Sequence, residues 1–484
     1  MPLILPGNVA SATASTTYDV DNSCRFNDGD SAYMHKTCSS AFDTDKWTIS
    51  LWCKRGALGI ETRLVSCDND DGSDDDCLKF QATDQLEFTI YDGGYTGTLK
   101  TNAKYRDVSA WYHIVAVWDS GNATAGNRMR LYVNGTEVTS FATDTNPAED
   151  ANATFGNTSH PIEIGRRGTN GTQYWDGYLA EVAVCDGQAY AASDFGEFDE
   201  DSPTIWKPKN VSGLTFGTSG FYLDFEASDN LGNDANGGTD LTEVNLAAAD
   251  QCQDSPTNNY NTMNPLVFRT TSGTIYTPTF SEGNTYVFST QDSTYDITGG
   301  TFMVSSGKWY FEWKNAGVGD TSADFSNGVG VKPADGSFDG TSSYLGTNRC
   351  YCANGNKADS ASVGGSAYGD SWTTDDIIGC YLDLDNSKIY FAKNGTMQNS
   401  ADVSDGTGFA FDDLNSHDSW IVFNAMADFG VGSQSGNYFN FGNPAFTISS
   451  SNSDANGYGS FEYNPTEDGV DFYALCTKNL AEYG

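Results

Sequence analysis

The chain has 484 residues, more than one ordinary hydrophobic core accommodates, so we expect several domains. It carries 65 acidic against 25 basic residues, which gives a formal net charge of −40. Such a charge repels phosphate backbones and anionic lipid surfaces, which argues against a nucleic-acid partner. No apolar run approaches the roughly 20 residues that span a bilayer, so we expect no membrane insertion.

The first 20 residues are expected to form an irregular arm with few apolar side chains. They lack the basic and apolar regions of a secretory signal, so synthesis in a cytoplasm is expected. Eleven cysteines are scattered without a paired rhythm, and only Cys350 and Cys352 lie close together. We therefore expect most of them to be buried thiols.

Short alternating apolar runs, separated by turn residues, begin near residue 21. The chain has 52 glycines and 13% aromatic residues, a composition typical of β-sandwiches with many turns. Asn134-Gly135 is a strong hairpin signal. We expect a first antiparallel sandwich over residues 21–227, with its clearest strands at residues 47–53, 86–91, 111–118, 129–133, 162–164 and 177–184.

Residues 228–265 are rich in Asn, Asp, Gly and Thr and are expected to form a linker. A second series of strands predicts another antiparallel sandwich over residues 266–449, followed by an irregular tail at residues 450–484. Its clearest strands are expected at residues 308–313, 328–331, 377–383, 388–393, 420–425 and 437–442. No helix longer than two turns is expected, so the fold class is all-β.

The first series resembles a laminin-G-like or concanavalin A-like jelly roll. The resemblance rests on five motifs in the family's order: WTISLWCKRG at 47–56, WYHIVAVWD at 111–119, RLYVNGTEV at 130–138, IEIGRRG at 162–168 and YWDGYLAEVAV at 174–184.

The second series resembles a SPRY domain. The motifs that carry this resemblance are GKWYFEW at 307–313, GVGV at 328–331, DDIIGCYLDLD at 375–385, IYFAKNGT at 389–396 and NYFNFG at 437–442. In the SPRY family, loops form the recognition surface.

Further segments resemble virion proteins of marine phages: MPLILPGN at 1–8, CRFNDGDSAY at 24–33, IWKPKNVSG at 205–213, DSPTNNYNTMNPL at 254–266 and ALCTKNL at 474–480. This resemblance implies a tail fibre, head fibre or decoration protein located in the virion. Such proteins are usually symmetric homo-oligomers that contact other virion proteins and, in adhesion roles, a host-surface glycan or receptor.

The concanavalin A-like family includes laminarinase-type glycoside hydrolases, which align acidic residues on alternate strand positions. Glu197, Asp199 and Asp201 come nearest to this pattern, but the last is Asp where that family has Glu. The segment lies beside Pro203, where the strand rhythm is lost, so a solvated loop and a protein that is not an enzyme are expected. A glycan-cleaving enzyme and a secreted cellular adhesin are the alternatives.

Two kinds of ligand contact are predicted. An acidic loop offers calcium the hard oxygen ligands Asp68, Asp70, Asp74 and Asp76, although it is not an EF-hand, and a merely solvated loop competes with this interpretation. No cofactor is required. Five aromatic side chains are candidates for stacking on sugar rings, against a packing role for each: Tyr174, Trp175, Tyr351, Tyr368 and Trp372. Core positions are expected for Trp47, Trp52, Trp309, Trp313 and His113.

Overall fold

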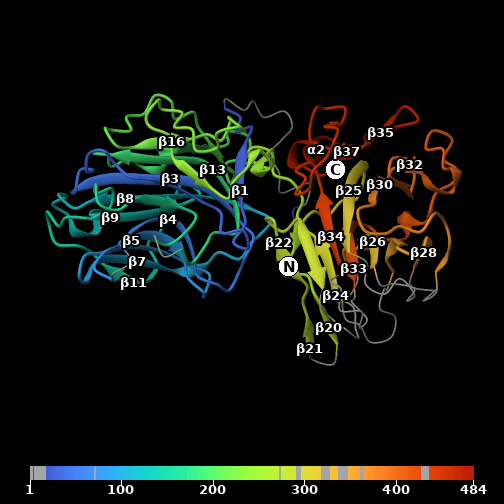
Figure 1. Ribbon diagram of the computed structural model, residues 1–484, viewed down its shortest axis with the longest axis horizontal. Helices are drawn as coiled ribbons and strands as arrows, with labels where there is room; N and C mark the ends of the chain where they lie inside the picture. Colours follow the sequence, from blue (N-terminus) through green and yellow to red (C-terminus); the bar gives the residue numbers. More distant parts are fainter. Residues whose placement is uncertain are drawn as a thin grey trace. The chain divides into compact units, whose positions relative to one another are not determined.

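The computed structural model describes residues 4, 18–69, 72–168, 171–271, 274–289, 296–317, 327–335, 347–359, 365–426 and 435–484. It divides into two compact units (Figure 1). The first unit consists of residues 13–257, and the second combines residues 1–12 with residues 258–484. Both are built almost entirely from antiparallel sheets, so the predicted all-β fold class is confirmed.

Sheet 1 of the first unit has the strand order β10-β9-β8-β3-β13-β1-β18, and β16 also pairs with β13. Its strands are β1 (Ser23–Phe26), β3 (Lys46–Arg55), β8 (Trp111–Asp119), β9 (Met129–Val133), β10 (Thr136–Glu137), β13 (Gly177–Asp186), β16 (Phe221–Leu223) and β18 (Gln251–Cys252). The Asn134-Gly135 turn between β9 and β10 has positive φ at both residues, which is the geometry that this dipeptide favours.

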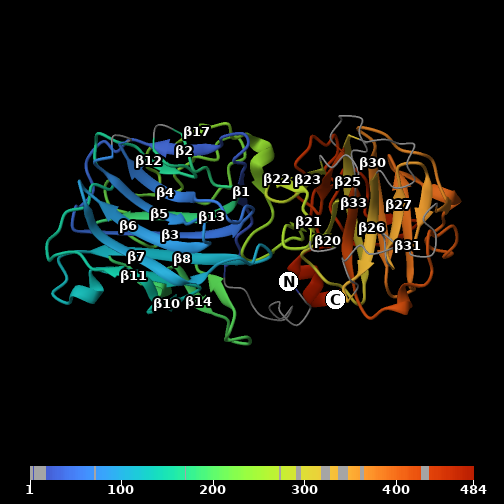
Figure 2. The ribbon, with the colours of Figure 1, turned by 90° about the horizontal axis from the view of Figure 1, so that it is seen from below.

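Sheet 2 has the order β11-β7-β6-β5-β4-β12-β2-β17, and Figure 2 shows these strands side by side. They are β2 (Tyr33–Lys36), β4 (Thr62–Asp68), β5 (Asp75–Phe80), β6 (Gln85–Tyr91), β7 (Tyr95–Lys104), β11 (Phe141–Thr145), β12 (Ile162–Ile164) and β17 (Thr242–Val244). The short strands β17 and β18 come from the segment expected to be a linker, and they pair with β2 and β1.

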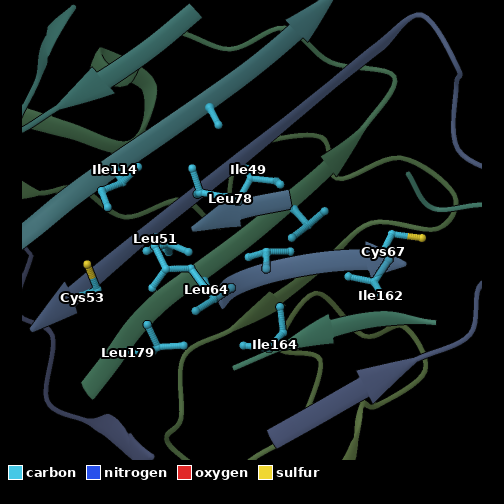
Figure 3. Packing of buried hydrophobic residues seen from close by; sticks show 14 of the residues in the cluster. Ile49, Leu51, Cys53, Leu64, Cys67, Leu78, Ile114, Ile162, Ile164 and Leu179 are labelled. Carbon is cyan, nitrogen blue, oxygen red and sulfur yellow. The ribbon is translucent and has the colours of Figure 1, made fainter. Parts of the chain in front are cut away.

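The core of the first unit lies between these two sheets (Figure 3). Because side chains alternate along a strand, every second residue of β3 points inward: Ile49, Leu51 and Cys53 are almost fully buried. They pack against residues of the opposite sheet such as Leu64 and Leu78. Trp47 and His113 are buried as expected, and all eleven cysteines of the chain are buried.

The outer face of sheet 1 is covered by the chain itself. Helix α1 (Ala192–Phe195) and the hairpin of β14 (Gly196–Phe198) with β15 (Trp206–Pro208) belong to the segment that packs there. Phe195 joins a cluster with Val115 and Val117 of β8. Trp52 lies in a second outer cluster, so its predicted burial is confirmed. Sheet 1 is therefore covered on both faces.

The second unit is also a two-sheet sandwich. Sheet 3 runs β19-β24-β33-β26-β27-β28-β29, with bounds β19 (Met263–Asn264), β24 (Asp296–Gly300), β26 (Asn327–Pro333), β27 (Arg349–Cys352), β28 (Asn356–Ala358), β29 (Ser366–Ala367) and β33 (Trp420–Met426). Sheet 4 runs β22-β23-β34-β25-β30-β31-β32, with bounds β22 (Thr279–Ser281), β23 (Tyr286–Ser289), β25 (Lys308–Gly317), β30 (Ile377–Asp383), β31 (Lys388–Lys393), β32 (Thr396–Met397) and β34 (Ser435–Asn440). Trp309 and Trp313 lie in its core as predicted.

The C-terminal segment, residues 443–484, packs on the outer face of sheet 4. Tyr310 of β25 and Phe461 and Phe472 of that segment belong to one buried cluster. The segment contains β35 (Thr466–Glu467), β36 (Val470–Asp471), β37 (Tyr473–Ala474), which runs parallel to β25, and helix α2 (Thr477–Tyr483). A separate hairpin joins β20 (Arg269–Thr271) to β21 (Thr274–Tyr276). None of the helices in the part of the chain that the structure describes is long and apolar enough to cross a membrane.

Candidate functional site

The outer face of sheet 2 carries mainly polar side chains. We call it the polar face: the outward side chains of β2, β12, β4, β5, β6 and β7, with the adjoining residues Arg166, Arg167 and Tyr174. The inward residues of β6, Leu86, Phe88 and Ile90, are fully buried in the core. The residues between them, such as Glu87 and Thr89, therefore point outward.

Ion pairs cover the middle of the polar face. Five basic residues there each have a carboxylate within 3.9 Å, and the pairs are Arg63–Asp75, Lys79–Glu61, Lys100–Glu87, Arg166–Glu163 and Arg167–Asp68. The face is thus close to neutral on a chain with a net charge of −40. Arg63, Asp68 and Glu163 are almost fully buried in these pairs. Glu61, Asp75, Lys100 and Arg167 keep 22–34% of their side chains exposed and retain hydrogen-bonding capacity for hydroxyl groups.

Tyrosines and one histidine mark the β2 end of the polar face. The ring centroid of Tyr33 lies 5.8 Å from that of His35 and 6.4 Å from that of Tyr174. The Arg166 guanidinium stacks over the Tyr33 ring at 3.4 Å, while its Nε and Nη2 atoms donate to the Glu163 carboxylate. All three rings are partly exposed. Tyr174 is thus the predicted ligand residue that the structure places at an accessible surface.

A second aromatic pair lies at the hairpin between β6 and β7. The Tyr95 side chain is 72% exposed, the largest exposure among the large hydrophobic residues that the structure describes. Its ring meets the Tyr91 ring edge-to-face, with 5.2 Å between centroids. Four interstrand spacings separate β6 from β2, so about 19 Å of polar surface lies between the two tyrosine groups.

The acidic loop supports this hairpin. The Gly93 amide donates to the Ser73 carbonyl oxygen at 2.5 Å, and Asp74 pairs with Asp92 in a β-bridge. One Asp76 carboxylate oxygen accepts the backbone N–H of Tyr91, and the other accepts the N–H and hydroxyl of Thr154. Burial raises the pKa of Asp76 to about 7, although these hydrogen bonds act in the opposite direction.

The predicted calcium ligands are not gathered around one point in the described residues. Asp68 is ion-paired with Arg167 at 2.7 Å, and Asp76 is committed to the contacts above. Asp74 lies 3.7 Å from His160, and Asp70 lies outside the described residues. Among the described residues, no group of three or more His, Cys, Asp or Glu side chains is arranged to hold a metal ion.

We therefore expect calcium to leave thermal stability unchanged. A ligand that binds only the folded state raises the melting temperature, so a bound ion would show as a shift between calcium and chelator. Melting curves of the full chain in millimolar calcium and in excess chelator make the comparison. A melting temperature that rises with calcium and falls with chelator would restore the calcium hypothesis.

The other four predicted ligand residues lie in the cores. Trp175, Tyr351 and Trp372 are at most 1% exposed, and Tyr368 is 7% exposed. Trp175 stacks on Phe80, and the other three rings contact one another and Phe391 or Trp313. A ring with no exposed face offers no platform for a sugar, so in this structure these four side chains contribute packing instead.

The acidic run considered for catalysis lies in β14 and in the turn that follows it. Glu197 lies in β14, and Asp199 and Asp201 follow it. The Asp199 carboxylate accepts the backbone N–H groups of Asp201 and Ser202, which fixes a tight turn. Lys207 of β15 lies within 3.9 Å of both Glu197 and Asp199.

Sequence analysis missed Tyr33, Tyr91 and Tyr95. A signal was present for the hairpin pair, since Asp92-Gly93-Gly94 is a turn sequence with a tyrosine on each side. Their side-chain exposure follows from the turn geometry and from the outer position of Tyr91 in the alternating strand. Tyr33 gave no local signal, because its neighbours Arg166 and Tyr174 are distant in sequence.

Comparison with known families supports both folds. Residues 27–192 match the model of the concanavalin A-like lectin/glucanases superfamily, in its laminin G form. Residues 308–442 match the SPRY domain model. The chain therefore contains a concanavalin A-like domain and a SPRY domain, and the corresponding part of the sequence-based resemblance is confirmed.

Solved structures similar to parts of this chain include three of different origin. The SPRY domain of human HERC1 is 16% identical, with a TM-score of 0.27, covering 37% of this chain and 96% of that one. A heptameric SAP-like pentraxin from Limulus polyphemus is 15% identical, with a TM-score of 0.26 and coverages of 36% and 80%. A putative carbohydrate binding protein from Bacteroides ovatus is 18% identical, with a TM-score of 0.31 and coverages of 47% and 59%.

Proposed function

We propose that this chain is a non-enzymatic binding protein that attaches to glycans through the polar face of its concanavalin A-like domain. The observation that carries the proposal is the exposed Tyr91–Tyr95 pair at one end of a charge-paired polar surface. Sugar rings combine apolar faces, which stack on aromatic rings, with hydroxyl groups, which hydrogen-bond to paired charges and amides. A second aromatic group around Tyr33 and Tyr174 suits an extended chain of several sugar units.

The charge of the chain favours neutral glycans over acidic ones. The net charge of −40 repels polyanions over the whole surface, while the polar face itself is locally balanced. A neutral chain of sugars gains contacts on the face without this repulsion. We therefore expect sulfated and uronate-rich glycans to bind more weakly than neutral ones.

Binding is expected to weaken about thirtyfold when both Tyr91 and Tyr95 are replaced with alanine, because each lost ring contact is worth on the order of 1 kcal/mol. A glycan array identifies the ligand, and calorimetric titration measures its affinity for each variant. Phe198→Ala, which truncates a 45% exposed ring outside the polar face, is the matched control and should keep wild-type affinity. No binding on the array would contradict the proposal. So would equal affinity of the double tyrosine variant and the Phe198→Ala control.

We further propose that the chain is a structural or adhesion component of a phage particle, located in the virion, where it forms a homo-oligomer and contacts other virion proteins. The resemblance of its terminal and connecting segments to marine phage virion proteins supports this role. Mass spectrometry of purified particles with antibody-gold labelling is the test.

The alternative of a glycan-cleaving enzyme predicts product release in a depolymerase assay on host polysaccharide, where a binding protein releases none.

A further inference from the structure

Lys54 and Asp254 form a buried pair that the proposed function does not use. Lys54 belongs to β3, and Asp254 follows β18 near the end of the first unit. The Lys54 Nζ atom lies 2.7 Å from Asp254 Oδ2, and both side chains are 1% exposed. The Asp254 backbone is held independently, because its carbonyl oxygen accepts the Ser23 hydroxyl.

The surroundings of this pair disfavour charge and are largely aromatic. The Tyr178 ring centroid lies 5.7 Å from Nζ. Trp111, which packs beside Tyr178, donates its indole N–H to Asp254 Oδ1 at 2.9 Å. Burial lowers the pKa of the Lys54 ammonium, although the Asp254 carboxylate acts against this shift. An ion pair so deeply buried is costly relative to the neutral amine and carboxylic acid, which differ from it only by one proton transfer.

We propose that Lys54 and Asp254 join in an intramolecular isopeptide bond. A proton passes from Nζ to Oδ2, which leaves a neutral amine against a neutral carboxylic acid. The Nζ lone pair then attacks Cγ, and the negative charge that develops on Oδ1 is stabilised by the Trp111 N–H already directed at that atom. A second proton passes from the nitrogen to Oδ2, and Oδ2 departs as water while the C=O bond to Oδ1 re-forms. One N–C bond forms, one C–O bond breaks, and no oxidant or cofactor is needed.

The two reacting side chains are already held in contact by the fold. Burial of both side chains holds the nucleophile against its acceptor and excludes water that would compete for the carbonyl carbon. The Lys36–Asp234 pair of the same unit is also buried, but its atoms lie farther apart and its carboxylate has other donors. Its Nζ–Oδ2 distance is 3.3 Å, and Asp234 Oδ1 accepts the backbone N–H groups of Tyr222 and Asn236.

Intact-mass spectrometry of the purified full chain tests the proposal. We expect the wild-type mass to be lower than the sequence mass by one water molecule. Tryptic digestion should then yield residues 47–55 joined to residues 210–269, because a modified Lys54 is no longer cleaved. Dehydration at any other site would leave these two peptides separate, so the cross-linked peptide identifies the bond.

Two variants separate bond formation from folding. Lys54→Arg keeps the charge pair but has no comparable nucleophile, and Asp254→Ala removes the acceptor carbon. Both variants are expected to have the mass calculated from their sequence, with no loss of water. Circular dichroism shows whether each variant folds, and Lys36→Arg, at the second buried pair, should still lose one water. Full mass and separate peptides in the folded wild type would overturn the proposal, and so would loss of water in Lys54→Arg.

Discussion

Replacing Glu312 with alanine is expected to destabilise the SPRY unit by about 3 kcal/mol or more, because buried donors left without an acceptor cost on the order of 1 kcal/mol or more each. Glu312 is fully buried and accepts a tyrosine hydroxyl, an asparagine amide and the backbone N–H groups of Glu462 and Tyr463. The last two contacts attach the C-terminal segment to β25. Denaturant unfolding and chymotrypsin digestion measure the loss, and cleavage should concentrate in residues 443–484.

Glu482→Ala is the matched control for this variant. Glu482 belongs to the same C-terminal segment but is exposed, so its replacement should leave both the unfolding curve and the digestion pattern unchanged. If Glu312→Ala unfolds at the wild-type denaturant concentration, the buried carboxylate does not attach the segment, and packing alone holds it to sheet 4.

The same residue makes stability depend on pH. Burial raises the pKa of Glu312 from 4.5 to about 7, against the effect of its four donors. The folded chain therefore keeps a proton that the unfolded chain loses. The resulting stabilisation, at most about 3 kcal/mol, is fully present below about pH 4.5 and is lost as the pH rises through 7. Glu312→Gln cannot ionise, so its melting temperature should fall less than that of the wild type between about pH 5 and pH 8.

Replacing Asn437 with leucine is expected to cost on the order of 3 kcal/mol, although leucine is more hydrophobic and of similar size. Asn437 lies at the centre of four fully buried asparagines that link the two sheets of the SPRY unit. Its Nδ2 donates to Oδ1 of Asn327 at 2.7 Å and of Asn424 at 3.0 Å, and its Oδ1 accepts Nδ2 of Asn327 and Asn315. Leucine leaves these amides without partners in a dry core.

Thermal unfolding of Asn437→Leu beside Asn415→Leu measures this effect. Asn415 is exposed in the second unit, so its substitution controls for the change in composition and should alter stability little. Equal or higher stability of Asn437→Leu would mean that hydrophobic burial outweighs the lost hydrogen bonds at this position.

Local sequence patterns predicted those strands and hairpins whose conformation is determined by neighbouring residues. Alternation predicted β3 and β6, a run of β-branched and aromatic residues predicted β8, and the Asn134-Gly135 dipeptide predicted the β9–β10 turn. In each case neighbouring residues determine the conformation, since side-chain period and turn geometry need no distant partner.

Elements that depend on partners far away in the sequence could not be predicted from local patterns. The three-residue strand β17 and the two-residue strand β18 exist only because β2 and β1 provide partners about 200 residues earlier in the chain. The C-terminal segment has little regular pattern of its own, and its order depends on Glu312 and Tyr310 of a distant strand. No local pattern in residues 228–265 or 450–484 encodes these contacts.

The candidate site was only partly predictable for the same reason. Aromatic residues in loop-like sequence either fold back into a core, as Trp175 and Trp372 do, or remain at the surface, as Tyr174 does. Local composition does not distinguish buried rings from exposed ones, because in both cases a large ring lies beside a stretch without strand pattern. Tyr95 is the case that the sequence could have revealed, since it follows the Asp92-Gly93-Gly94 turn sequence.

Hydrogen-exchange mass spectrometry with and without the glycan selected on the array tests most directly whether the polar face is the binding surface. With ligand bound, amide exchange should slow in residues 91–97 at the hairpin and in residues 33–36 of β2, while the SPRY unit is unaffected. Protection confined to the SPRY unit, or unchanged exchange in both segments of the polar face at saturating glycan, would contradict this assignment.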